Sequence, residues 1–381
     1  MRKFFTNRDV NHIFLHKLIY YCGERIGWIF GPIFMLQLGY GIDVTLAIWS
    51  GIFAMRLPIR YLYLRSFKFF GLTRAVCFGL VCYAGAMCFL PHIKERPDLI
   101  PWFLLVFSVA MTFYYTAFHT IFGLVGDTGN RGKHMSMINT LSTILSALIP
   151  LLSATIVGLA GFETLFSISA ILMVIAAIPL WKLKTPTPKL LTKHSEKQKA
   201  AVRWIMKYHF FYAIKEYASI FLWRFVVFTM VGSLMMFGTV LTAGLIFFAI
   251  LQLFVGHYID KGRGYLMLKI GTAISLVQVL IRSAIPGVPA AMAVTEGLSI
   301  GNQLMTQADV NFYNQGKTAE SYFHYIYWAE VAWDASVTAI LLTIAGMVHI
   351  GFSLQMIMLI LSPIGLLGLY WINLQAKNAT S

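Results

Sequence analysis

The stretch WKLKTPTPKLLTKHSEKQKAAVRWIMK, residues 181–207, is the only polar segment of any length in the chain. Its seven lysines and Arg203 stand against a single acid, Glu196. Six apolar segments precede this stretch and six follow it, and each has roughly the 20 residues that a helix needs to cross a bilayer. This arrangement predicts two membrane-embedded halves of similar fold, joined by a basic linker.

The composition supports a membrane protein. Of the 381 residues, 58% are hydrophobic and only 12% are charged, against roughly a quarter in a soluble globular protein. The net charge of +15 needs no nucleic-acid partner, because membrane proteins keep lysine and arginine in short cytoplasmic loops. We therefore expect the chain to be embedded in a lipid bilayer. This location excludes most classes of enzyme.

The predicted fold is all-α and polytopic, with 12 transmembrane helices in two pseudo-symmetric six-helix bundles. We assign an N-terminal bundle to residues 1–181, a cytoplasmic linker to 182–207 and a C-terminal bundle to 208–381. The predicted spans are 12–37, 43–63, 72–90, 101–124, 137–159, 162–181, 209–232, 235–258, 265–283, 287–308, 320–346 and 350–373.

The distribution of basic residues predicts the orientation. Almost all of the loop lysines and arginines fall on one side, whereas the opposite loops offer only Lys94 and Arg96. Because lysine and arginine are retained in the cytoplasm, both termini are expected there. We expect a monomer in a bacterial inner membrane, in contact with lipid.

Searches for enzyme and cofactor motifs find nothing. The chain has no phosphate-binding loop, no zinc-protease motif and no nucleophile elbow. Its four cysteines form no CxxC pair, so neither a metal nor a disulfide is expected. The sequence therefore predicts a protein without a cofactor that is not an enzyme, and any uphill transport would have to draw on an ion gradient.

An internal repeat relates the two halves. Tyr20 and Glu24 in the first span align with Tyr212 and Glu216 in the seventh, at a shift of 192 residues. Two further matches, at loops between spans, occur in the same order. Such duplication is typical of secondary transporters.

One loop resembles a known family. The segment Gly256-His-Tyr-Ile-Asp260-Lys-Gly-Arg263-Gly resembles the loop signature of the major facilitator superfamily, between the predicted eighth and ninth spans. The resemblance implies alternating access, in which two six-helix bundles rock about a midplane site. It also implies that Asp260 and Arg263 form a cytoplasmic gating loop.

Charged residues inside the predicted spans are the candidate site residues, because an ionised side chain in the hydrocarbon zone is costly unless it is paired or lines a pathway. A carboxylate and a tyrosine share a helix face in several places, and Arg224 and His119 add further polar groups. The candidate pathway residues are Tyr20, Glu24, His119, Tyr212, Glu216, Arg224, Glu296, Tyr327, Glu330 and Asp334.

The predicted eleventh span carries two of these acids on one face. Phe323, Tyr327, Glu330 and Asp334 recur at helical spacing. Two carboxylates this close repel each other when both are ionised. Either one of them holds a proton, or a basic group or a cation lies between them.

Fixed salt bridges are the alternative reading of the intramembrane charges. In that reading Glu24 pairs with Arg25 or Arg224, and Glu216 pairs with Lys215 or Lys17. We expect Arg56, Arg60 and Arg282 to extend to the membrane interface, because each lies near the end of its predicted span.

These observations predict a secondary active transporter that moves a small charged or amphiphilic organic solute by alternating access, coupled to a proton or cation gradient. One alternative is a passive facilitator of the same fold. The other is a membrane sensor or scaffold that binds a ligand without moving it.

Overall fold

The computed structural model describes residues 8–125, 145, 147–181, 183, 185, 195–259, 264–285 and 287–378. Across these residues the regular secondary structure is helical and no strand occurs. The all-α prediction is therefore confirmed for the described part of the chain.

In the described part of the first half of the chain there are four long helical elements. They are α1 (Arg8–Gln37), α2 (Ile42–Phe89), α3 (Ile100–Val125) and α5 (Ile149–Ala177), with 3₁₀ turns η2 (Leu90–Ile93), η3 (Pro97–Leu99) and η4 (Ile178–Leu180). Two of these elements each contain two helices, because Gly71 and Gly161 adopt φ angles of 67° and 79°. Only glycine adopts this left-handed region at little cost. The predicted spans 43–63 and 72–90 thus lie on either side of Gly71.

The second half contains more and shorter helices. They are α6 (Glu196–Lys215), the π-helical turn η5 (Glu216–Phe221), α7 (Leu222–Val231), α8 (Leu234–Ile259), α9 (Gly264–Ala284), α10 (Pro289–Gly297), α11 (Ile300–Leu304), α12 (Thr306–Thr318), α13 (Tyr322–His349) and α14 (Leu354–Asn378). Elements α6, η5 and α7 follow one another without a break, so together they form one long helical path.

Two predicted boundaries in this half are wrong. The seventh span was predicted to begin at residue 209, but α6 begins at Glu196. The Ser195 hydroxyl accepts a hydrogen bond from the Gln198 backbone amide at 3.2 Å and thereby caps the first turn of the helix. The tenth span was predicted to end at residue 308, but the helical path continues through α12 to Thr318.

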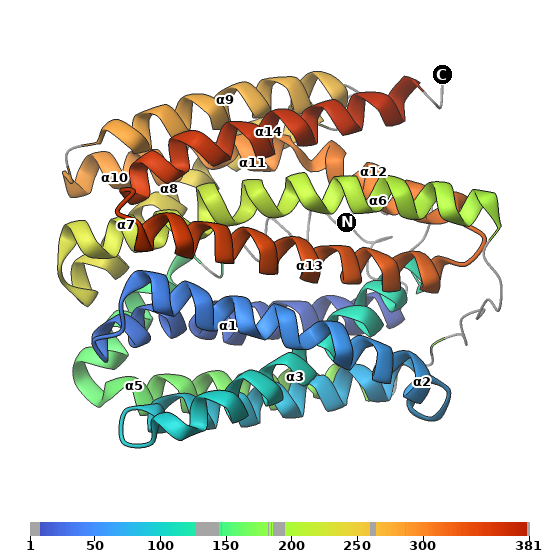
Figure 1. Cartoon of the computed structure of the whole chain (residues 1–381), viewed down its shortest axis with the longest axis horizontal. Helices are drawn as coiled ribbons and strands as arrows, with labels where there is room; N and C mark the ends of the chain where they lie inside the picture. The colour runs from blue at the N-terminus through green and yellow to red at the C-terminus, as the bar shows by residue number, and fades with distance from the viewer. Residues whose placement is uncertain are drawn as a thin grey trace.

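The two halves of the chain form two groups of helices that lie side by side (Figure 1). Helix α2 packs against α13 and α5 packs against α8, so both contacts join one group to the other. The Ser50 hydroxyl donates to the Thr338 carbonyl oxygen at 3.2 Å, and the Leu151 amide donates to the Thr242 hydroxyl at 3.0 Å. The central space between the groups is thus bounded by direct contacts.

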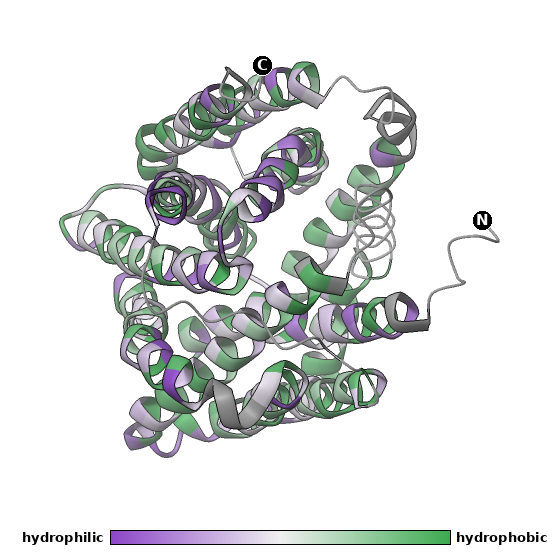
Figure 2. Cartoon of the chain, turned by 90° about the vertical axis from the view of Figure 1, so that its right-hand side faces the viewer, coloured by the Kyte–Doolittle hydropathy of each residue, from purple (hydrophilic) through white to green (hydrophobic). Residues whose placement is uncertain are grey.

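The exterior of the protein is strongly apolar. Large hydrophobic side chains are exposed along many helices, including Leu159 at 85% and Ile178 at 67% of their surface. Figure 2 views the helices nearly end on and shows hydrophobic residues along most of them. By length and composition, eight helical segments of the described residues are apolar enough to cross a membrane. An apolar exterior around buried charges is the pattern expected in lipid.

Candidate functional site: a polar cavity between the two halves

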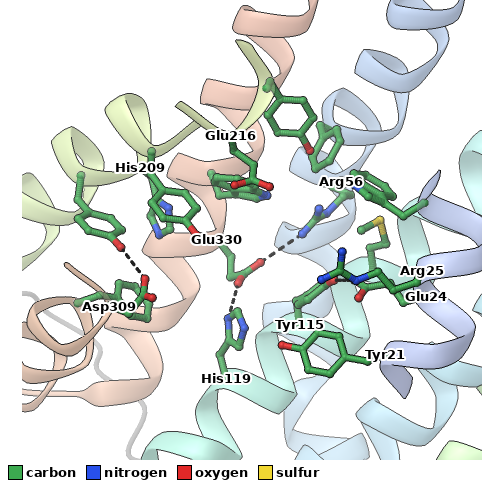
Figure 3. A pocket seen from close by; sticks show the side chains of 18 of the residues that line it. Tyr21, Glu24, Arg25, Arg56, Tyr115, His119, His209, Glu216, Asp309 and Glu330 are labelled. Atoms are coloured by element: carbon green, nitrogen blue, oxygen red, sulfur yellow. Dashed lines mark hydrogen bonds and ion pairs between the residues drawn. The ribbon is translucent and has the colours of Figure 1, made fainter. Parts of the chain in front are cut away.

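A cavity of about 490 Å³ lies between the two groups of helices (Figure 3). Its walls come from α1, α2 and α3 on one side and from α6, η5, α7, α12 and α13 on the other. The ionisable residues of its lining, tyrosines aside, are Glu24, Arg25, Arg56, His119, His209, Glu216, Arg224, Asp309 and Glu330. Tyrosine, tryptophan and phenylalanine side chains make up most of the remaining wall.

Most of the charged lining comes from helices that are either too polar or too short to count among the eight apolar segments. Helices α1, α6–α7 and α10–α12 are not in that set. They supply Glu24, Arg25, Glu216, Arg224 and Asp309 to the cavity. The helices that bring most of the charge to the cavity are therefore not the ones that alone have the length and composition of a membrane span.

A buried network of four charges joins the two halves beside the cavity. From α2, Arg60 contacts Glu330 at 2.7 Å and also pairs with Asp334, both of which lie on α13. Arg56 lies 3.2 Å from Glu330 and 3.0 Å from Asp334. Arg56 Nε and Asp334 Oδ1 form an ion pair but no hydrogen bond, because the N–H group does not point at the oxygen atom. Two guanidinium groups therefore balance two carboxylates.

Helix α3 completes this network. The His119 Nδ1 atom lies 2.8 Å from Glu330, and Arg60 donates to the Thr116 hydroxyl at 2.6 Å. Glu330 therefore touches groups from α2 and α3 while remaining part of the cavity wall (Figure 3). Of the two alternatives for the paired acids of α13, the structure shows the one in which basic groups lie between them.

The expectation that Arg56 and Arg60 extend to the membrane interface is wrong. Their exposed fractions are 1% and 0%, and each pairs with two carboxylates of the opposite half. Sequence position placed them near a helix end. What their position could not reveal is that the acids of α13 lie directly opposite.

Glu24 has a different environment. The Tyr20 hydroxyl donates to Glu24 Oε1 at 3.1 Å, and the Tyr115 hydroxyl donates to the same atom. The Tyr20 and Tyr115 hydroxyl oxygens also lie 2.9 Å apart. Among the described residues no basic group forms a salt bridge with Glu24, so the pairing with Arg25 or Arg224 considered as the alternative does not occur there. Phenols, not cations, hold this carboxylate at the cavity wall (Figure 3).

Lys17 lies one helical turn below this cluster, among aromatic rings. Its ammonium nitrogen is 4.8 Å from the Tyr20 ring centre, 4.5 Å from that of Tyr21 and 4.6 Å from that of Phe118. Cation–π attraction to these faces offsets part of the cost of burying the charge. The side chain that could have neutralised Glu216 in the alternative reading is therefore held within the first half.

Glu216 is the repeat-related counterpart of Glu24, and both line the cavity from opposite halves. Lys215 Nζ lies 3.7 Å from Glu216, a loose contact that agrees with one of the predicted pairings. The ring of Tyr212 packs near Tyr208 and Trp333, with centres 5.6 and 5.7 Å away.

The π-helical turn η5 aligns Glu216 with Arg224. Eight residues of a regular α-helix rotate a side chain to about 80° from its starting direction. A π turn absorbs one additional residue, which leaves a difference of only about 20°. Both side chains consequently line the same cavity although their sequence spacing does not predict a shared face.

Two further predicted residues, Glu296 and Tyr327, lie outside the cavity lining. Glu296 on α10 pairs with Arg282 at 2.7 Å and does not line the cavity. Arg282 is only 1% exposed, so its expected placement at the interface is wrong. Tyr327 is buried in α13 but is not part of the cavity lining. Asp260 and Arg263 lie outside the described residues.

Apart from Arg56 and the tyrosines, three ionisable lining residues were not among the predicted site residues. Asp309, which accepts a hydrogen bond from Tyr208 at 3.2 Å, lies just beyond the predicted end of its span. His209 was the first residue of a predicted span, but the extended α6 places it well inside the helix. Arg25 was considered only as a partner of Glu24. Asp309 and His209 could have been found by extending each predicted helix beyond its apolar residues.

A charged and aromatic cavity between two groups of membrane helices is typical of membrane transport proteins. The model of the Major Facilitator Superfamily matches residues 70–311 of the sequence. The chain belongs to the major facilitator superfamily, as its loop motif indicated, and it is a transporter and not an enzyme.

Solved transporters share this fold at low sequence identity. The Escherichia coli fucose:proton symporter FucP is 14% identical, with a TM-score of 0.66 and 98% of both chains covered. The POT family transporter PepTSo is 11% identical, with a TM-score of 0.69 and 98% of both chains covered. The nucleoside transporter NupG is 12% identical, with a TM-score of 0.64 over 97% of this chain and 100% of that one. No curated protein sequence matches this chain.

Proposed function

We propose that the protein is a proton-coupled symporter of a small charged or amphiphilic organic solute. In this proposal twelve helices form two six-helix bundles, residues 1–181 and 208–381, that rock about the central cavity. The protein would act as a monomer in a bacterial inner membrane, with both termini in the cytoplasm. Structures of the same fold include a fucose:proton symporter and proton-dependent oligopeptide transporters. This analogy supports a proton as the coupling ion.

The observation that carries this proposal is the environment of Glu24. A carboxylate that faces a cavity, accepts hydrogen bonds from Tyr20 and Tyr115 and lacks a salt bridge among the described residues can gain a proton without breaking an ion pair. Protonation removes a charge from a low-dielectric space and so changes the free energy of the loaded cavity. Glu24 is therefore the proposed proton carrier, with Glu216 as its counterpart.

The four-charge network has a different proposed role. Arg56 and Arg60 on α2 hold Glu330 and Asp334 on α13, so the contact must open if the two bundles separate along this line. These acids then stabilise one conformation of the transport cycle. His119, which touches Glu330, couples the network to the cavity.

One observation favours a passive facilitator. Two of the acids proposed from the sequence as coupling groups, Glu330 and Asp334, already neutralise two arginines. If Glu24 and Glu216 remain ionised throughout the cycle, the solute would equilibrate without a response to the proton gradient.

Transport in proteoliposomes decides between these functions. We would reconstitute the full chain, impose an inside-alkaline gradient and screen pooled solutes for proton-linked accumulation. A symporter accumulates solute, and a protonophore abolishes the accumulation. Glu24→Gln should retain exchange of solute across the membrane while losing gradient-driven accumulation, and the exposed-loop variant Glu95→Gln should behave as wild type. Equilibration that is insensitive to the protonophore would instead establish the passive facilitator.

A further inference from the structure

Two arginines of the cavity have no carboxylate partner. Arg25 on α1 makes no hydrogen bond or ion pair with any described residue, and it points into the cavity (Figure 3). Arg224 on α7 makes a single weak contact, a 3.5 Å donation to the Trp28 carbonyl oxygen. Both side chains are half-buried, so neither charge is fully hydrated.

The other arginines buried between helices are paired. Arg56 and Arg60 share two carboxylates, and Arg282 binds Glu296 at 2.7 Å. Among the described residues the fully buried guanidinium groups are therefore neutralised, including that of Arg56, which also lines the cavity. Arg25 and Arg224 lack such a partner, and both of them line the cavity.

The two unpaired arginines come from opposite halves and lie near each other. Trp28 follows Arg25 by about one helical turn, so the contact of Arg224 with the Trp28 carbonyl brings its guanidinium close to Arg25. The charge of Arg25 disfavours that of Arg224, whereas the carboxylates of Glu216 and Glu296 favour it. An anion bound between two guanidinium groups offsets the repulsion that remains between them.

We propose that Arg25 and Arg224 bind an oxyanion of the transported solute, either a carboxylate or a phosphate group. Guanidinium groups bind both anions through paired hydrogen bonds. The body of the solute lies against the aromatic wall, to which Tyr21, Trp28 and Tyr217 contribute beside the two arginines. This inference rests on the proposed function and narrows its solute to an organic anion that touches both halves.

Equilibrium binding tests the inference without a gradient. Benzoate, phenylphosphonate, benzyl alcohol and benzylamine each carry one phenyl ring. They differ in their polar group, which is anionic in the first two, neutral in the alcohol and cationic in the amine. Each would be added at about 10 mM and constant ionic strength to the purified full chain, and the melting temperature recorded. We expect benzoate or phenylphosphonate to raise it by roughly 1–3 °C, and the neutral and cationic compounds to leave it unchanged. The anion with the larger shift distinguishes a carboxylate site from a phosphate site.

Variants locate the site. Arg25→Gln and Arg224→Gln should each abolish the shift, while Arg25→Lys and Arg224→Lys, which keep the charge, should retain part of it. Arg65→Gln is the matched control, because Arg65 is exposed and its hydrogen bond among the described residues goes to Tyr61. If a glutamine variant fails to fold, the lysine variant at that position replaces it, and a partial shift is then the expected result.

Three results would overturn the inference. They are equal shifts with the alcohol or the amine, no shift with either anion, and full shifts in both glutamine variants. The proposed function fails separately: anion binding without transport in proteoliposomes would leave the site intact and remove the symporter. Gradient-driven uptake of a neutral or cationic solute that both glutamine variants still accumulate would do the reverse.

Discussion

Neutralising Asp334 should destabilise the protein through the four-charge network. Asp334→Asn leaves Arg56 and Arg60 with only Glu330 in a region where both arginines are at most 1% exposed. Breaking a buried ion pair by removing one partner typically costs about 3–5 kcal/mol, because the remaining charge is buried without compensation. Arg60→Gln should cost a similar amount for the same reason.

The double variant Arg60→Gln/Asp334→Asn gives the sharper result. It removes one charge of each sign and leaves Arg56 opposite Glu330, 3.2 Å apart. Independent sites would give a total cost of about 6–10 kcal/mol, whereas we expect the double variant to cost no more than either single one. The coupling energy would then be about 3 kcal/mol or more.

Reversible unfolding in mixed micelles measures these free energies. The exposed pair Arg96 and Asp98, 2.7 Å apart, is the control. The same cycle there should give no measurable coupling, because water screens both charges. Additive costs at Arg60 and Asp334, within about 0.5 kcal/mol, would refute the claim that the network acts as one unit.

The remaining predictions concern the cavity, the contact between halves and one helix start. Glu24→Gln should flatten the pH dependence of uptake in proteoliposomes, since the proposed carrier can no longer lose its proton; an unchanged pH profile would exclude Glu24. A Cβ at Gly238 would lie 2.6 Å from the Pro150 carbonyl oxygen, so Gly238→Val should push α8 from α5 and lower the melting temperature. Wild-type stability of that variant would contradict this packing. Ser195→Ala should cost about 1 kcal/mol by removing the helix cap and speed amide exchange in the first turn of α6, including Gln198; unchanged exchange would show that the cap contributes nothing.

Apolar periodicity predicts the helices well and their ends poorly. Hydrophobic runs place α3 and α8 within a residue or two of their observed bounds. The runs stop at residue 308 in the tenth span, yet α12 continues to Thr318, because a helix can extend into polar sequence once its neighbours cover it. Asp309 was lost at that boundary. Ser195 and Gln198 form a recognisable capping pattern, so the start of α6 was predictable.

The sequence likewise predicted some features of the candidate site and not others. A charge inside an apolar run is visible in the sequence, which is why Glu24, Glu216 and Glu330 were identified. Partner choice is not visible, because it depends on which helix faces which. Arg56 and Asp334 are 278 residues apart in the chain, and only the packing of α2 on α13 makes them neighbours.

The aromatic wall also makes the protein its own optical reporter. Trp28 and Trp333 line the cavity from α1 and α13, and both are half-buried. Indole emission responds to the polarity and charge within a few ångströms, so a solute that displaces water from this wall should shift the fluorescence of the unlabelled chain. Phenylalanine at either position would remove one contribution and show which bundle the ring of the solute touches. Occupancy, conformational opening and proton loading could then be followed in real time by light alone.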